Sequence, residues 1–279
     1  MHGNVSLVKS LIGEKVSAGT PRELLRFGPM VTERLHGVTF ATPLFGVGLA
    51  VGGSDSSSEF ALDVLPAAEL PWTADSPLTA RWLESGEACE LAVRGIGKFV
   101  VTSAVIAATP VPGVREDLLR LFLRYHAVGL RMRIAGFAVL HGAAVSLDGR
   151  AHVWVGASGA GKTSSAVEAC ARGARFLADE VVVLRPSPDG FFVRRGVPWP
   201  RVEAGAPMGM HELARRAVSE AAEEVPLADV RLARAVGGPG EAAQLAAQIL
   251  GGYRPELGCT PAELQTRGML LDALLSLRG

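Results

Sequence analysis

A glycine-rich stretch near the middle of the chain has the residue types that bind phosphate. It reads Gly156-Ala157-Ser158-Gly159-Ala160-Gly161-Lys162-Thr163 and matches the pattern G-x-x-x-x-G-K-[ST] at every fixed position. In such a loop, backbone amides converge on phosphate oxygens, the lysine ammonium neutralises the β- and γ-phosphates, and the threonine hydroxyl ligates Mg²⁺. The stretch therefore predicts a nucleotide-phosphate site, the alternative being a glycine-rich turn with a solvated lysine.

Two adjacent carboxylates, Asp179 and Glu180, begin seventeen residues after Lys162. One carboxylate can hold Mg²⁺ and the other can accept the proton of an attacking hydroxyl. The sequence predicts that both lie near the phosphates, with Asp179 catalytic and with Thr163, Asp179 and Glu180 as metal ligands. The alternative is an acidic pair at a strand edge that faces water.

His141 is a further candidate for handling a proton or contacting phosphate, because it precedes the segment that leads into the loop. A packed or surface histidine is the other interpretation, and His152 is expected to be structural. Arg194, Arg195 and Arg201 could meet a phosphate or an acidic substrate, or form a solvated basic face. The loop 196–200 (Gly-Val-Pro-Trp-Pro) is placed near the substrate.

The elements expected around these residues follow from short-range patterns. Asp148-Gly149 between two apolar runs predicts a hairpin over 143–155, and Asp189-Gly190 predicts another. A helix is expected from Lys162 to Ala171, and a strand at 180–184.

Before the first hairpin, the sequence of residues 38–108 is typical of strands. The expected strands are 45–51, 60–65, 90–94 and 99–107, followed by a helix over 115–132. Residues 1–35 form a helical or mobile lead-in. After about residue 205, abundant Ala, Glu, Leu and Arg favour helices at 211–224, 226–236, 241–250 and 261–277, the last with Thr260 as its N-cap.

Composition excludes several classes of protein. With 48% hydrophobic and 20% charged residues the chain can bury a core, and its net charge of zero argues against a nonspecific nucleic-acid binder. No apolar run reaches the length of a membrane span, and no signal peptide is evident. Three widely separated cysteines favour reduced thiols and a cytoplasmic location. Only four of 28 basic residues are lysines, and one of them is Lys162.

Three strings stand close together in the chain: Leu140-His141-Gly142-Ala143-Ala144-Val145, the loop 156–163, and the segment 172–180, which reads RGARFLADE. Taken together, they resemble HPr kinase/phosphorylase and its shorter relatives. The chain looks most like relatives associated with peptide biosynthesis, including lasso-peptide kinases. The resemblance covers about 38–202. The departures are Glu180 in place of a second Asp, the lack of an evident R-G-[LIV]-G segment for phosphorolysis, and an unfamiliar helical end.

The resemblance implies an α/β fold with the mixed-sheet core shared with phosphoenolpyruvate carboxykinase. Its expected parts are a lead-in 1–35, a strand-rich part plus helix 36–135, a P-loop kinase core 136–204 and a helical extension 205–279.

The implied activity is ATP- and Mg²⁺-dependent phosphorylation of a hydroxyl, typically Ser, on a peptide or protein such as a natural-product precursor. Asp179 is the implied base or metal-side acid, and His141 matches the family's functional histidine. Two alternatives stay open: a small-metabolite P-loop kinase, and an ATP-binding scaffold with little turnover. The oligomeric state, including a homo-oligomer, is open too.

Overall fold

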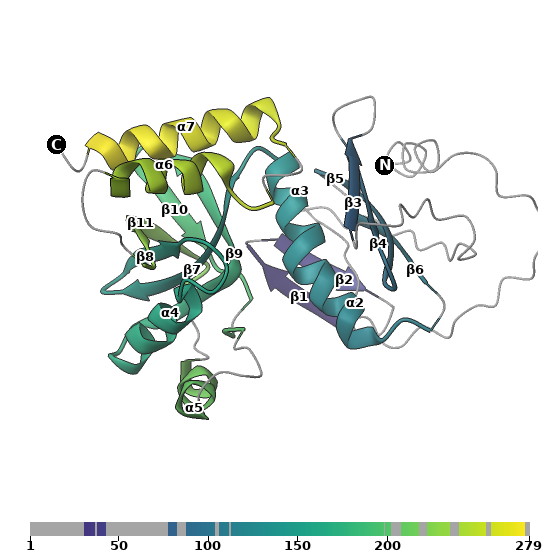
Figure 1. Ribbon diagram of the computed structural model, residues 1–279, viewed down its shortest axis with the longest axis horizontal. Helices are drawn as coiled ribbons and strands as arrows, with labels where there is room; N and C mark the ends of the chain where they lie inside the picture. Colours follow the sequence, from purple (N-terminus) through teal and green to yellow (C-terminus); the bar gives the residue numbers. More distant parts are fainter. Residues whose placement is uncertain are drawn as a thin grey trace, which may run out of the picture. The chain divides into compact units, whose positions relative to one another are not determined.

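The computed structural model describes two compact units, both built from sheets and helices, so the protein is mixed α/β (Figure 1). One unit comprises Met1–Glu33 and Val38–Leu123, and the other comprises Arg34–Gly37 and Arg124–Gly279. We call them the first and second units. This division differs from the expected boundaries at 35, 135 and 204. The described residues are 31–36, 38–42, 78–82, 88–103, 106–111, 113–197, 199–201, 208–217, 222–234, 240–254 and 258–276.

The first unit contains a four-stranded antiparallel sheet. Its order follows the chain: β3 (Leu78–Trp82), β4 (Ala88–Val93), β5 (Gly97–Thr102) and β6 (Ile106–Pro110). Every residue of β4 is buried. The predicted strand at 90–94 is thus confirmed, whereas the one predicted at 99–107 is divided between β5 and β6.

A two-stranded sheet, β1 (Val31–Leu35) with β2 (Val38–Thr42), precedes these strands. The prediction of a helical or mobile lead-in is therefore wrong for residues 31–35. The strands predicted at 45–51 and 60–65 lie outside the described residues.

The predicted helix over 115–132 is confirmed with one difference. It consists of α2 (Glu116–Phe122), a π-helical turn (Leu123–Ala127) and α3 (Val128–Ile134). A π-helical turn widens a helix by one residue and is frequent at functional sites. Two of its residues, Tyr125 and His126, lie at the candidate active site.

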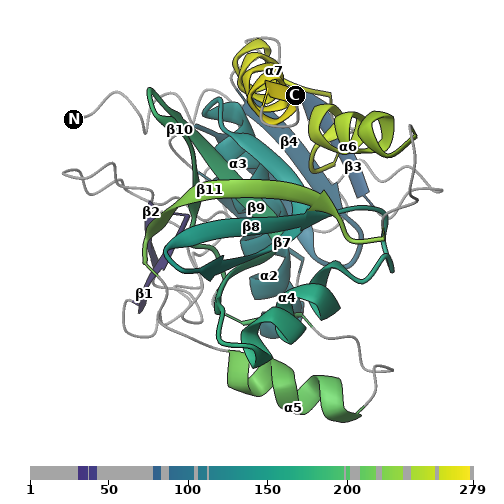
Figure 2. The ribbon, with the colours of Figure 1, turned by 90° about the vertical axis from the view of Figure 1, so that its left-hand side faces the viewer.

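The second unit is organised by a closed five-stranded sheet of order β10-β11-β8-β7-β9 (Figure 2). The pair β8–β11 is parallel and the other pairs are antiparallel, so the expected mixed sheet is confirmed. The strands are β7 (Ala138–Leu147), β8 (Arg150–Val155), β9 (Arg175–Ser187), β10 (Gly190–Arg194) and β11 (Glu224–Leu232).

Both predicted hairpins are present. Asp148 and Gly149 have φ values of +51° and +75° between β7 and β8, the left-handed conformations that a tight hairpin turn needs. The second hairpin joins β9 to β10 at Asp189-Gly190. The helix α4 (Lys162–Ala171) has the predicted bounds, and the strand predicted at 180–184 lies within β9.

Helices cover the sheet of the second unit from two sides (Figures 1 and 2). Buried residues of α6 (Gly240–Gly251) and α7 (Pro261–Ser276), such as Ile249 and Leu270, share a core cluster with Leu140 of β7. A smaller cluster joins Ala166 of α4 to the sheet.

The prediction of a helix at 226–236 is wrong, because β11 occupies 224–232. Composition favoured a helix there, but Val225 and Val230 are buried in the sheet, and tertiary pairing overrides a weak propensity. β11 lies between β8 and β10. Region 205–279 therefore contributes a strand to the sheet that contains β8, the strand that leads into the glycine-rich loop.

The other predicted helices of this region are present with small shifts. The helix α5 (Met208–Ala217) ends before the predicted 224, and α6 and α7 agree closely with 241–250 and 261–277. The Glu263 amide donates to Thr260 Oγ1 at 3.1 Å, which confirms the predicted N-cap.

Candidate active site

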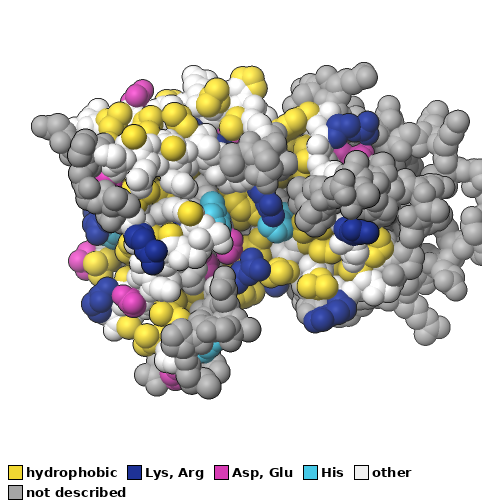
Figure 3. Space-filling model, in the orientation of Figure 1, with side chains coloured by type: hydrophobic (Ala, Val, Ile, Leu, Met, Phe, Trp, Pro, Cys, Tyr) yellow, Lys and Arg dark blue, Asp and Glu magenta, His cyan; other side chains and the backbone are white. Residues whose placement is uncertain are grey.

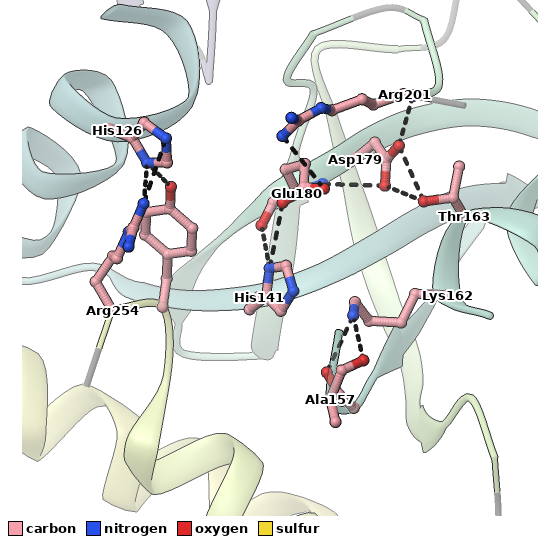
Figure 4. A network of polar contacts seen from close by, with 11 residues as sticks. His126, His141, Ala157, Lys162, Thr163, Asp179, Glu180, Arg201 and Arg254 are labelled. Atoms are coloured by element: carbon pink, nitrogen blue, oxygen red, sulfur yellow. Dashed lines mark hydrogen bonds and ion pairs between the residues drawn. The ribbon is translucent and has the colours of Figure 1, made fainter. Parts of the chain in front are cut away.

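The glycine-rich loop lies between the end of β8 and the start of α4, the strand–loop–helix setting that the motif requires. Gly159 and Gly161 have φ values of +75° and +94°, which other residues rarely adopt. The Lys162 side chain is buried, and its Nζ donates to the carbonyls of Gly156 at 3.1 Å and Ala157 at 2.8 Å (Figure 4). The loop thus folds around a cation.

Thr163 joins the loop to the first of the two carboxylates. Its Oγ1 donates to Asp179, at 3.0 Å from Oδ1 and 3.2 Å from Oδ2. Asp179 also accepts from the backbone amides of Arg201 (2.7 Å) and Glu180 (3.0 Å). Residues from α4, β9 and the 199–201 segment therefore converge on one carboxylate.

Burial dominates the electrostatics of Asp179, which is 2% exposed. It raises the pKa of the Asp179 carboxyl to about 6; the hydrogen bonds from Arg201 and Thr163 oppose the shift, and the Glu180 charge adds to it. Burial also lowers the pKa of Lys162, while the Glu180 and Asp179 charges act in the opposite direction. The site thus holds a carboxylate that titrates near neutral pH beside a buried cation.

The second carboxylate faces His141 rather than Thr163. His141 Nδ1 lies 3.3 Å from the Glu180 carbonyl oxygen and 3.5 Å from Glu180 Oε2, and Arg201 Nη1 lies 3.7 Å from Glu180 Oε1. Burial lowers the pKa of His141, as do Lys162 and Arg254, whereas Glu180 raises it. The sequence predicted His141, Lys162, Thr163, Asp179 and Glu180 as residues of one site. The structure brings these five residues together (Figure 4).

Glu180 has φ = +65°, an unusual value for a non-glycine residue within a strand. It pairs across the sheet with Gly142, where an added Cβ would lie 2.7 Å from the Trp154 carbonyl oxygen. The chain therefore needs glycine after His141 for β7 to approach β8 this closely.

Four residues that sequence reasoning left out also lie in the cluster. Tyr125 and His126 come from the π-helical turn, and Tyr253 and Arg254 follow α6. Tyr253 Oη hydrogen-bonds to His126 Nδ1, and Arg254 Nη2 lies 3.1 Å from the same nitrogen. The Arg201 guanidinium lies 5.9 Å from the centre of the Tyr125 ring.

No local pattern marks these four residues. The pair Tyr125-His126 reads as part of the helix predicted at 115–132, and Tyr253-Arg254 as part of the connection between the helices predicted at 241–250 and 261–277. The only available signal was that each pair sets an aromatic ring beside a histidine or arginine side chain.

On the part of the second unit seen in Figure 3, histidine, arginine and acidic side chains reach the surface together.

Other candidate residues are engaged elsewhere. Arg194 of β10 pairs with Glu224 of β11 at 2.7 Å, and Arg195 pairs with Glu223 just beyond the ends of these strands. His152 Nδ1 lies 3.1 Å from Asp229 Oδ1, which agrees with its expected structural role. Of the three predicted arginines, Arg201 is the one that contacts the carboxylate pair.

The predicted substrate loop 196–200 is described except for residue 198. Its Trp199 is exposed, and the Arg124 guanidinium lies 5.1 Å from the centre of the Trp199 ring. The loop leads directly into Arg201, whose amide reaches Asp179.

The oxygen donors fit Mg²⁺ bound together with phosphates. Thr163, Asp179 and Glu180 offer hard oxygen ligands beside Lys162, and Mg²⁺ usually keeps waters and substrate phosphates in its shell. Within the described ranges, no group of three or more His, Cys, Asp or Glu side chains is placed to hold a metal ion. A cage made of protein ligands alone is thus not found there.

Comparison of the chain with models of known protein families and with curated proteins finds no match. Among the helices that the structure describes, none has the length and apolar character needed to cross a membrane. Cys89, Cys170 and Cys259 are all free thiols.

Proposed function

We propose that this protein transfers the γ-phosphate of ATP to a hydroxyl group, with Ser of a peptide or protein as the acceptor. The proposed core is a P-loop kinase core of the HPr kinase type, formed by β8, the loop and α4. One observation carries the proposal: Thr163, next to the buried Lys162, donates to a buried carboxylate, Asp179.

Each residue has a part in this reaction. The loop amides and Lys162 bind the β- and γ-phosphates. Thr163 and Glu180 would hold Mg²⁺, and Asp179 would lie next to the ion. When bound, Mg²⁺ neutralises charge on the phosphates. A carboxyl with a pKa of about 6 is largely ionised at pH 7, so Asp179 can take up the acceptor's proton.

The bond changes balance without a further reactant. The acceptor oxygen forms a bond to the γ-phosphorus as its own O–H bond breaks, and the proton passes to Asp179. The bond from the γ-phosphorus to the β–γ bridging oxygen breaks, and ADP leaves with that electron pair.

The test compares two Asp→Asn variants. Asp179→Asn should lower transfer of labelled phosphate from ATP to a pool of Ser peptides by about 10²–10⁴-fold, while ATP binding persists. Asp229→Asn, on β11 beside His152, is the control and should keep full activity. A protein that binds ATP with Mg²⁺ but transfers phosphate to neither peptides nor metabolites would support the scaffold alternative, and one that binds no ATP would refute the proposal.

A further inference from the structure

Four side chains form a continuous group beside the carboxylate pair. The Tyr253 ring lies 6.0 Å from the His126 ring and 6.2 Å from the His141 ring, so it bridges the two histidines. Arg254 Nη2 contacts both nitrogens of His126, at 3.1 Å from Nδ1 and 3.4 Å from Nε2. A guanidinium is thus held next to His126, and its charge also lowers the pKa of the predicted catalytic histidine, His141.

His126 contacts Arg254 as a neutral group. Burial and, to a smaller extent, the Arg254, Arg201 and His141 charges together lower the pKa of His126 to about 3. A neutral imidazole and the Tyr253 hydroxyl both contact the guanidinium and help to orient it. Arg201 is a second cation of the group, since its guanidinium reaches Glu180 and its charge acts on His126.

The turn that carries Arg254 is fixed by buried charges. Arg254 has φ = +55°, and its carbonyl accepts from Arg133 Nη1 at 3.0 Å. Arg133 is fully buried and its Nε donates to Glu263 at 2.7 Å; Glu263 also pairs with buried Arg267. A non-glycine residue in a left-handed conformation persists where its surroundings hold it, and such residues cluster at functional sites.

The position of this group relates it to the proposed reaction. Figure 4 shows Lys162 and Thr163 on one side, His126 and Arg254 on the other, and His141 and Glu180 between them. Phosphates bound at the loop would lie on the first side. The second side is then where an acceptor molecule can reach the carboxylates.

We infer that Arg254, together with Arg201, forms a subsite for an oxyanion of the acceptor, either a carboxylate or a phosphate. That the bound molecule is the phosphate acceptor rests on the proposed function, but binding of the anion itself does not depend on turnover. Arginine suits the role because its planar fork binds both kinds of group with two hydrogen bonds. The acceptor is accordingly an acidic molecule, with its anionic group near the reacting hydroxyl.

The test follows the imidazole NMR signals of His126 and His141 during titration with orthophosphate and, separately, acetate. ADP with Mg²⁺ is present in excess to occupy the glycine-rich loop. We expect at least one anion to shift the His126 signals saturably, and the tighter of the two identifies a phosphate- or carboxylate-bearing acceptor. Arg254→Gln should weaken this binding on the order of tenfold, and Arg254→Lys should weaken it less.

Arg231→Gln is the matched control, because Arg231 is exposed on β11 and pairs with Asp229. It should leave the anion affinity unchanged. The inference is overturned if neither anion shifts His126 saturably, or if Arg254→Gln binds as tightly as the wild type. Failure of the proposed function would look different, since no phosphate transfer from ATP would then be detected while the anion response of His126 would persist.

Discussion

The glycine-rich loop and the Tyr253–Arg254 turn both bring a cation to the same cluster, but they are built differently. Lys162 is held by carbonyls only five and six residues earlier in the chain. Arg254 is held through Arg133 and Glu263, which lie 130 residues apart. The first site is local and is therefore visible as a motif. The second depends on a buried ion network that forms only when the second unit folds.

Removal of the central acid of that network should have the largest effect on stability. Glu263→Ala leaves Arg133 and Arg267 buried together as like charges, and loss of one partner of a buried pair costs about 3–5 kcal/mol. Urea denaturation measures the free energy of unfolding. Glu224→Ala is the control, since Glu224 is a half-buried partner of Arg185 and Arg194 and should cost about 1 kcal/mol or less.

Equal losses of unfolding free energy in Glu263→Ala and Glu224→Ala would show that the buried network is no more important for stability than the half-buried Glu224 pairs. The milder Glu263→Gln keeps Oε1, which accepts from both arginines, and loses the negative charge, so its loss of stability should fall between those of the two alanine variants. In its folded state this variant should bind ATP with Mg²⁺ as the wild type does, because the loop does not depend on the network.

Near the glycine-rich loop, a substitution at Gly142 of β7 should have a smaller effect on stability, because it brings a side chain against the backbone of β8. Gly142→Ala places a methyl group 2.7 Å from the Trp154 carbonyl oxygen of β8, which cannot rotate away. Overpacking of this kind costs about 1–3 kcal/mol, measured by thermal or urea unfolding. Gly268→Ala is the matched control: it lies in α7 with nothing near its added Cβ, and it should stabilise the helix by up to about 1 kcal/mol.

The pH dependence of stability should reveal Asp179 with a still smaller effect. Its pKa rises from 3.8 in the unfolded chain to about 6 in the folded protein, so the folded protein binds the proton more tightly. The resulting stabilisation is complete below pH 3.8 and is lost as the pH rises through 6. Between pH 7.5 and pH 5 the wild type should therefore gain about 1 kcal/mol relative to Asp179→Asn. Parallel stability curves for the two proteins would show that Asp179 titrates normally.

The sequence alone predicted the parts that short-range rules determine. The two Asp-Gly hairpins, the bounds of α4 and the grouping of Lys162, Thr163 and Asp179 all follow from residues close together in the chain. Gly142 could be named as part of a motif, but its reason, the approach of β7 to the Trp154 carbonyl, is visible only in the folded sheet.

The sequence misled where distant contacts decide. Residues 224–232 have a helix-favouring composition, yet they pair with β8 and β10 and form β11. Likewise, a π-helical turn aims Tyr125 and His126 at the cluster, and Arg133 fixes the turn that carries Arg254. None of these features has a signal within a window of a few residues.

The most direct measurement of the central claim is the affinity for ATP with Mg²⁺ in two Lys→Ala variants, by isothermal titration calorimetry. Lys162→Ala should weaken binding about 100-fold, because a buried charge-assisted contact to phosphate is lost. Lys98→Ala removes a lysine of the first unit that pairs with Glu90, and it should bind as the wild type does. Wild-type protein that binds no ATP, or equal affinities in the wild type and Lys162→Ala, would contradict the account.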